Sequence, residues 1–195
     1  MKTIMDILTP SNIQFMIFTG AKYSLLLAIG ALFFGVILGI IGAALKLSKH
    51  FVLRAIGNVY VEIFRGTPML LQIMFLYLAV PTVVQSITGQ RFQADPYVCG
   101  LIAMSLNSGA YQVELIRSGI LGVDKGQWEA CETIGLNYVQ TMRYVILPQA
   151  FKRIIPPLIS EFITLIKDSS LIFTIGAVEL LATASVIGAN TFNYL

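Results

Sequence analysis

A run of 23 residues without a charged side chain, from Tyr23 to Leu45, constrains the fold of this chain more than any other feature. A helix rises about 1.5 Å per residue, so a helical run of this length crosses the roughly 30 Å of hydrocarbon in a bilayer. It is too long for the apolar region of a signal peptide, which has about 7–15 residues. We therefore predict a membrane-spanning helix. Its glycines either form a face that admits a neighbouring helix or only reflect the frequency of glycine in membrane helices.

The composition agrees with a membrane protein and excludes several other classes. Hydrophobic residues make up 56% of the chain and charged residues 12%, whereas a soluble domain has about 25% charged residues. The chain is too apolar to stay disordered. Its net charge of +3 comes without a basic run, so we predict no nucleic-acid partner.

The chain also lacks residues for common chemistry. It has neither the phosphate-binding loop G-x-x-x-x-G-K-[ST] nor the nucleophile motif G-x-S-x-G, so we predict no enzyme activity. His50 stands beside Lys49 with no acidic residue close in sequence, and we predict no metal site. Cys99 and Cys131 have no partner nearby, which argues against a disulfide framework.

Further apolar segments follow the first span. Residues 66–90 carry no charge, and Pro81 predicts that their span ends near Val80. The third predicted span is 96–113, with Pro96 in its first turn. We therefore expect at least three crossings before the longest polar stretch of the chain.

The fourth predicted span starts around Ile154, reaches Ile166 and contains Glu161. Residues 171–189, broken only by Glu179, either complete this span or form a re-entrant or interfacial helix. Lys and Arg residues set the orientation, because they gather in cytoplasmic loops. Segments 46–65 and 114–153 hold nine of them and 81–95 holds one, which places the N-terminus outside.

The polar segment 114–153 predicts a docking element. Glu129 to Ile134 is typical of a short helix with acidic residues in its first turn. Gly135 would end this helix in a left-handed conformation, and a second helix would stop at Pro148. Such a knob on a membrane protein suits a contact with another protein.

The knob carries a pattern that resembles the membrane permease subunit of bacterial ABC importers. That family has E-A-A, three residues, G, nine residues, I, one residue, L-P. The corresponding residues here are Glu129, Ala130, Cys131, Gly135, Val145, Leu147 and Pro148. Cys131 and Val145 are small apolar replacements. Residues 61–72, 107–114 and 167–171 resemble the polar amino-acid uptake branch in particular.

The resemblance implies an all-α membrane protein, a polytopic helical bundle of the ABC importer permease type. Residues 1–195 would form one transmembrane permease domain, with a cytoplasmic coupling loop at about 114–153. Permeases of this branch have a further span after the region that matches 171–195. We therefore expect a fifth span beyond Leu195 rather than a shortened permease.

The resemblance also implies the partners and the location. The chain would lie in the bacterial cytoplasmic (inner) membrane as a multi-pass protein. Two cytoplasmic ATP-binding subunits would dock on the coupling loop and hold ATP and Mg²⁺, so the chain itself would need no cofactor. An extracytoplasmic binding protein would deliver the amino acid. A second permease chain, identical or related, would complete the cavity, since one bundle gives only half of it. The ATPase-coupling candidates are Glu129, Ala130, Cys131, Gly135, Leu147 and Pro148.

Glu161 is the candidate substrate contact, because an ionisable group at membrane depth is costly and by default functional. Asp168 is seven residues on, so the two carboxylates lie about 20° apart on one helix face and about 10 Å apart along the axis. This stripe favours a cationic ligand, and hence a basic amino acid. Alternatively, Glu161 pairs with a Lys or Arg of a neighbouring helix, and Asp168 pairs with Lys167.

Five polar or adaptable residues are secondary substrate-binding candidates, although such residues also join helices to each other. They are Met69, Gln72, Asn107, Ser108 and Tyr111.

A second function also remains open at this point. A secondary transporter or ion channel subunit could use Glu161 as an ion or proton site, but it would leave the spaced motif of the polar segment unexplained.

Overall fold

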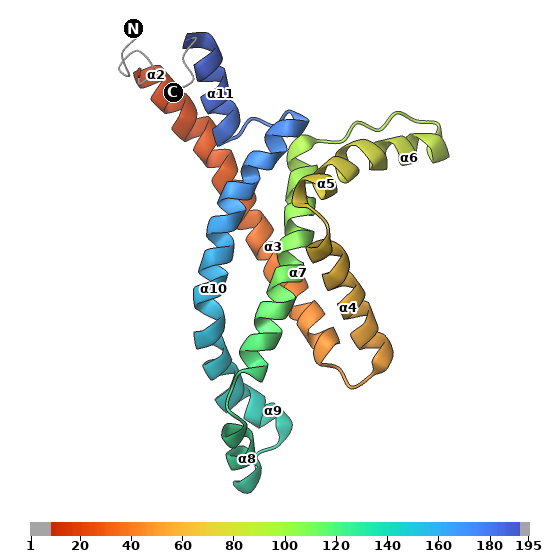
Figure 1. Ribbon diagram of the computed structural model, residues 1–195, viewed down its shortest axis with the longest axis vertical. Helices are drawn as coiled ribbons and strands as arrows, with labels where there is room; N and C mark the ends of the chain where they lie inside the picture. The colour runs from red at the N-terminus through yellow and green to blue at the C-terminus, as the bar shows by residue number, and fades with distance from the viewer. Residues whose placement is uncertain (1–8, 192–195) are drawn as a thin grey trace.

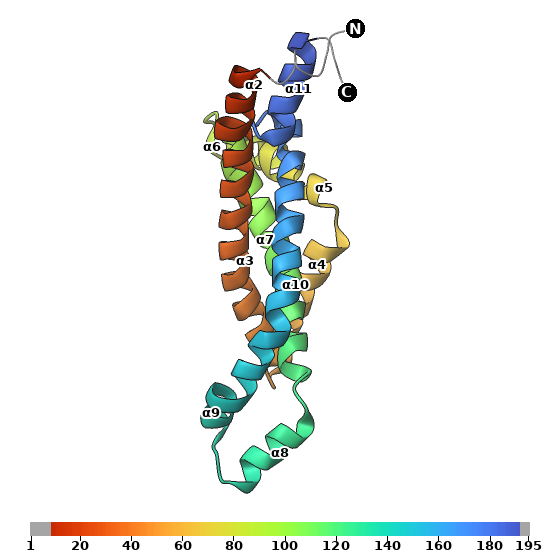
Figure 2. The same ribbon diagram turned by 90° about the vertical axis from the view of Figure 1, so that its left-hand side faces the viewer.

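The computed structural model describes residues 9–191, a bundle of long helices without a β-strand in that range. Two helices are long and apolar enough to cross a membrane, and a third span results if one bent pair of helices is counted as one. α3 and α7 cross at the centre, and α10 runs beside them (Figure 1). The short helices α8 and α9 lie at one end, and α2 and α11 lie at the other (Figure 2).

The first span is longer than its charge-free run. α2 (Pro10–Phe15), the π-helical segment η1 (Met16–Ala21) and α3 (Lys22–Leu47) form one continuous helix. The side chain of Thr9 caps its start by accepting a hydrogen bond from the Asn12 amide at 3.3 Å, and Pro10 occupies its first turn. The prediction of a membrane-spanning helix over 23–45 is therefore confirmed, with about three and a half further turns before it.

Glycines bring the two central helices into close contact. α7 (Pro96–Leu121) starts at the Asp95 cap and makes its most extensive contact with α3. A Cβ atom at Gly35 would lie 2.6 Å from the Gln112 side-chain nitrogen, and one at Gly39 would lie 2.7 Å from Gln112 Cβ. The glycines of α3 thus do form a face for a neighbouring helix, as small residues do in membrane proteins.

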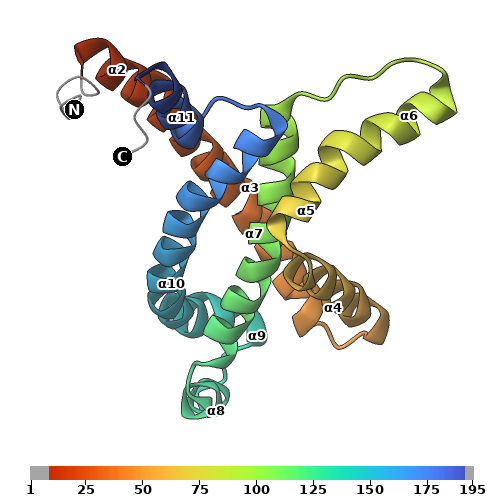
Figure 3. The same ribbon diagram turned by 45° about the horizontal axis from the view of Figure 1, so that its top comes forward.

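The second span does not end at Val80. α4 (Phe51–Gly66) leads to α5 (Met69–Met74), the π-helical segment η2 (Phe75–Ala79) and α6 (Val80–Thr88), which form one 20-residue helix. Pro81 lies in the first turn of α6, two residues after the end of the π-helical segment η2, and a proline is tolerated in the first turn of a helix. The helix ends at Gly89, where φ is +71°. This helix leaves the bundle as an arm (Figure 3).

Both ends of the predicted loop 114–153 are helical in the structure. α7 continues to Leu121, and a second helix begins at Tyr138. That helix consists of α9 (Tyr138–Thr141), η3 (Met142–Ile146) and α10 (Leu147–Asp168). Pro148 therefore does not stop it, because the residue lies in the first turn of α10, directly after a π turn.

Two more boundaries differ from the predictions. α8 spans Lys125–Thr133, so the knob helix begins one turn before Glu129. α10 runs through Pro156 and Pro157 and begins two turns before Ile154. Prolines are tolerated in membrane helices, where neighbouring groups satisfy the backbone atoms that they free.

The segment after α10 is a broken helix. The 3-10 helix η4 (Ser169–Ile175) ends at Gly176, where φ is +86°, and α11 (Leu180–Thr191) follows at an angle of 56°. Glu179 is fully buried, and its carboxylate accepts hydrogen bonds from the Leu181 and Ala182 amides, both at 2.8 Å. This acid therefore caps α11 and does not face lipid.

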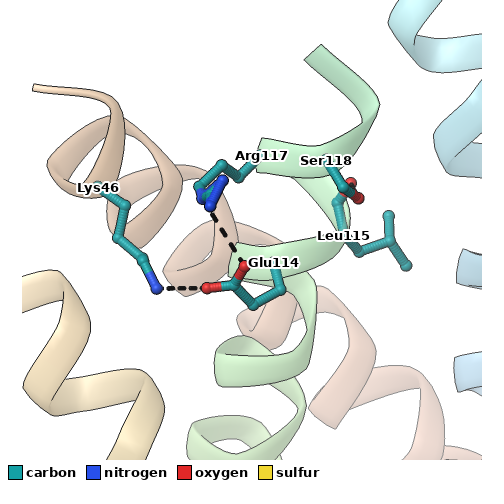
Figure 4. Close-up of polar contacts among 5 residues, drawn as sticks. All are labelled: Lys46, Glu114, Leu115, Arg117 and Ser118. Atoms are coloured by element: carbon teal, nitrogen blue, oxygen red, sulfur yellow. Dashed lines mark hydrogen bonds and ion pairs between the residues drawn. The ribbon is translucent and has the colours of Figure 1, made fainter. Parts of the chain in front are cut away.

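A charged contact joins α3 to α7 near their ends. Lys46 of α3 forms an ion pair with Glu114, and Arg117 Nε lies 3.7 Å from the same carboxylate (Figure 4). The Lys46 and Glu114 side chains are 14% and 28% exposed. Such a partly buried pair is screened less than a surface pair.

We expect Lys46→Met and Glu114→Gln to be non-additive in the free energy of unfolding. A coupling of about 1 kcal/mol should appear in a double-mutant cycle, because each variant alone removes the same contact. The measurement is thermal unfolding of the purified protein in detergent. Arg117→Met should couple to Glu114→Gln more weakly. Additive Lys46 and Glu114 effects would show that the pair contributes nothing.

Candidate functional site

A cavity of about 580 Å³ opens where the connector between α4 and α5 meets α7 and α10. Its lining consists of Arg65, Gly66, Thr67, Pro68, Met69, Asn107, Tyr111, Glu161, Thr164 and Asp168. Five of the seven predicted substrate-binding residues are therefore in one place. Gln72 and Ser108 are absent from the lining and lie behind it, in contact with residues that form it.

The two acids of α10 share the cavity, as their spacing predicts. Glu161 is half-buried, and its Oε1 accepts a hydrogen bond from the Ser108 hydroxyl at 2.8 Å. Within residues 9–191, no Lys or Arg nitrogen lies within 4.0 Å of either carboxylate. The structural ion pairs considered for Glu161 and Asp168 are thus not formed, and both carboxylates remain available to a ligand.

Arg65 brings a positive charge to the same cavity. Its guanidinium lies over the Tyr111 ring, 4.9 Å from the ring centroid, a cation–π arrangement that holds the side chain in place. In the sequence, Arg65 counts as a loop charge and belongs to the stretch 61–72 that resembles the amino-acid uptake branch, but it is not among the predicted site residues. Its position directly before the Gly66-Thr67-Pro68 break, at the start of an apolar span, is the signal that could have identified it.

Thr164 was missed as well, and here the helix period could have found it. It lies three residues after Glu161 and four before Asp168, so all three face the cavity from α10. The cavity therefore has an acidic wall with a hydroxyl group and a single arginine. A zwitterion needs such an arrangement, because its ammonium and carboxylate groups require partners of opposite charge.

Gln72 and Asn107 hold the end of α4, which carries Arg65, and the connector that follows it. The Asn107 amide donates to the Phe64 carbonyl oxygen at 2.9 Å and to Gln72 Oε1 at 3.2 Å. The Gln72 amide donates to the same carbonyl at 2.9 Å and to Thr67 Oγ1 at 2.8 Å. Gln72 therefore joins helices and loop, whereas Asn107 both joins them and lines the cavity.

A second candidate site is the knob at the far end of the molecule, built from α8 and the turn to α9 (Figure 2). Asp124 caps α8 by accepting from the Gly126 amide at 2.7 Å. At the other end, Gly135 has a φ of +78°, its amide donates to Glu132 O, and the Leu136 amide donates to Cys131 O, both at 3.0 Å. This pair of bonds is a Schellman motif, which glycine favours.

The predicted coupling residues differ in exposure, and Leu147 and Pro148 lie in α10 rather than in the knob. Glu129, Ala130, Gly135 and Pro148 are exposed, whereas Cys131 is buried and Leu147 is half-buried. Sequence reasoning overlooked several exposed apolar side chains at this end of the molecule. These are Ile134, Tyr138, Val139 and Tyr144, each at least 65% exposed. Charged and apolar groups on one small surface are typical of a protein contact.

Comparison with known proteins gives a consistent result. Residues 35–194 match the family of binding-protein-dependent transport system inner membrane components. A putative glutamine transport system permease protein of Rickettsia conorii is 40% identical over 180 residues, which cover 92% of this chain and 80% of that protein. An arginine transport system permease protein of Bacillus subtilis is 38% identical and covers 92% of this chain and 79% of its own length.

Among solved structures, the chain is similar to the crystal structure of an amino acid ABC transporter with histidines. The TM-score is 0.88 at 32% sequence identity, and the match covers 100% of this chain and 86% of that one.

Proposed function

Because the chain belongs to the family of binding-protein-dependent transport system inner membrane components and is an amino-acid ABC importer permease, we propose that its substrate is a basic amino acid. The observation that carries the proposal is the cavity with Glu161, Asp168 and Arg65 on its walls. Arg65 would receive the carboxylate of the amino acid. Glu161 and Asp168 would receive its two cationic groups through charge-assisted hydrogen bonds.

The relatives support a polar substrate without deciding its charge. One is named for glutamine transport and another for arginine transport. An amino acid with a neutral side chain, such as glutamine, has only one cationic group, its α-ammonium. It would leave the second carboxylate without a counter-charge, and an unpaired charge in a partly buried site is unfavourable. The acidic wall therefore favours arginine, lysine or histidine.

The energy for transport would come from the ATP-binding partners through the knob. ATP hydrolysis in these importers belongs to a separate subunit. We place two copies of that subunit on the exposed surface of α8, and a second permease chain across the cavity. Closure of the ATPase pair would then rock the helices between inward-open and outward-open states. In this arrangement the knob faces the cytoplasm and the N-terminus faces outside.

We expect uptake of labelled arginine into vesicles only when the permease, its ATPase and its binding protein are all present with ATP. The complex is reconstituted in proteoliposomes, and uptake is followed with and without ATP, and with imposed proton or sodium gradients. Labelled glutamate is the charge-reversed control and should not enter. Uptake driven by an ion gradient alone would favour the alternative of a secondary transporter. Preference for glutamate would overturn the basic substrate.

A further inference from the structure

A line of three polar side chains crosses from α7 to α10 and begins at a residue outside the cavity. Gln112 and Ser108 are both fully buried on α7. The Gln112 side-chain nitrogen donates to the Ser108 hydroxyl oxygen at 3.0 Å, and that hydroxyl donates to Glu161 Oε1 at 2.8 Å. Gln112 therefore contacts the cavity's acid only through Ser108.

The line has a direction, because a hydroxyl group has a single hydrogen. Ser108 accepts from Gln112, so its own hydrogen is directed to Glu161. Without Gln112, the hydroxyl could rotate toward a carbonyl oxygen one turn back in its own helix, as serine commonly does. Gln112 thus makes Ser108 a dedicated donor to the Glu161 carboxylate.

This arrangement leaves the oxygen atom of the Gln112 side-chain amide without a hydrogen bond among the described residues. This atom, Oε1, is buried. A flipped amide would give this oxygen the Ser108 hydrogen, but Glu161 would then lose its donor. Space for the line comes from α3, since a Cβ atom at Gly35 would lie 2.6 Å from Gln112 Nε2 and 3.1 Å from Ser108 Oγ.

We propose that Gln112 is a positioning residue that sets the preference of the cavity for cationic ligands by orienting Ser108 toward Glu161. The inference rests on the proposed function, since it concerns the same cavity. It assigns selectivity to a residue that does not touch the substrate, and it explains why a fully buried amide leaves its oxygen unpaired.

The test compares arginine with citrulline, whose neutral ureido group has nearly the same shape as guanidinium. Binding of each to the assembled importer in detergent is measured for wild type, Gln112→Met, Ser108→Ala and the double variant. Gln112→Met should weaken arginine binding about tenfold, because a hydrogen bond to a charged group is lost. Citrulline binding should change much less. In the Ser108→Ala background, Gln112→Met should have no further effect on the ratio of arginine affinity to citrulline affinity.

Gln85→Met is the matched control, since Gln85 is exposed on α6 and outside the cavity; it should leave both affinities unchanged. Equal losses for arginine and citrulline in Gln112→Met would mean that Gln112 only supports packing, and would overturn the inference. An unchanged ratio in both Gln112→Met and Ser108→Ala would also overturn it. A wild-type complex that does not prefer arginine to citrulline would instead contradict the proposed basic substrate.

Discussion

Arginine binding by the assembled importer should fall roughly 100-fold when Glu161 is replaced by Gln. The variant keeps the shape of the side chain but removes the charge. It leaves a cationic group of the ligand in a partly enclosed site with one carboxylate instead of two. Binding is measured on the isolated membrane complex, because an external binding protein would otherwise contribute its own selectivity.

Glu114→Gln is the matched control for this variant. Glu114 is also a partly buried carboxylate, but it lies on α7 outside the cavity lining and pairs with Lys46. Its replacement should leave arginine affinity unchanged. Intact affinity in Glu161→Gln would show that Glu161 has a structural role only.

Replacement of Gly135 by Val should abolish most of the substrate-stimulated ATP hydrolysis of the complex, a loss of about tenfold or more. Gly135 has a φ of +78°, and its turn closes α8. A β-branched residue in this conformation is strained by more than the 1–2 kcal/mol of an ordinary residue, so the turn would refold and displace Glu129 and Ala130. Asn tolerates left-handed conformations, so Gly135→Asn should give an intermediate loss.

Gly89→Val provides the control for strain alone. Gly89 has a φ of +71° and, like Gly135, nothing within 4 Å of the position of a Cβ atom, but it lies at the end of α6. It should leave stimulated hydrolysis nearly intact. Full stimulation in Gly135→Val would show that the knob is not where the ATPase is coupled.

The sequence predicted the helices well and their ends poorly. Charge-free runs report which segments can be buried in lipid, and the segment 23–45 lies inside one helix. Proline was taken as a terminator at Pro81 and Pro148, yet both helices continue. Each of these residues lies in the first turn of the α-helix that follows a π turn, where a proline is tolerated. No local pattern in the sequence announces a π turn.

The site was predictable to the extent that it depends on one helix. Glu161 and Asp168 share a face because α10 is regular between them, and the helix period is enough to place them together. Arg65 could not be placed in this way. The end of α4 that carries Arg65 is held by Asn107 and Gln72, whose bonds to the Phe64 carbonyl depend on the packing of α5 against α7. Such long-range contacts have no periodic signal.

The turns of the knob are held by hydrogen bonds between residues that lie close together in the sequence. Asp124 caps the start of α8, the Schellman bonds close its end, and Asn137 and Gln140 form a capping box at the start of α9. Each of these bonds joins residues no more than five positions apart. Local contacts form early during folding. These local bonds of the knob can therefore form as it leaves the ribosome, before α10 packs beside α3 and α7.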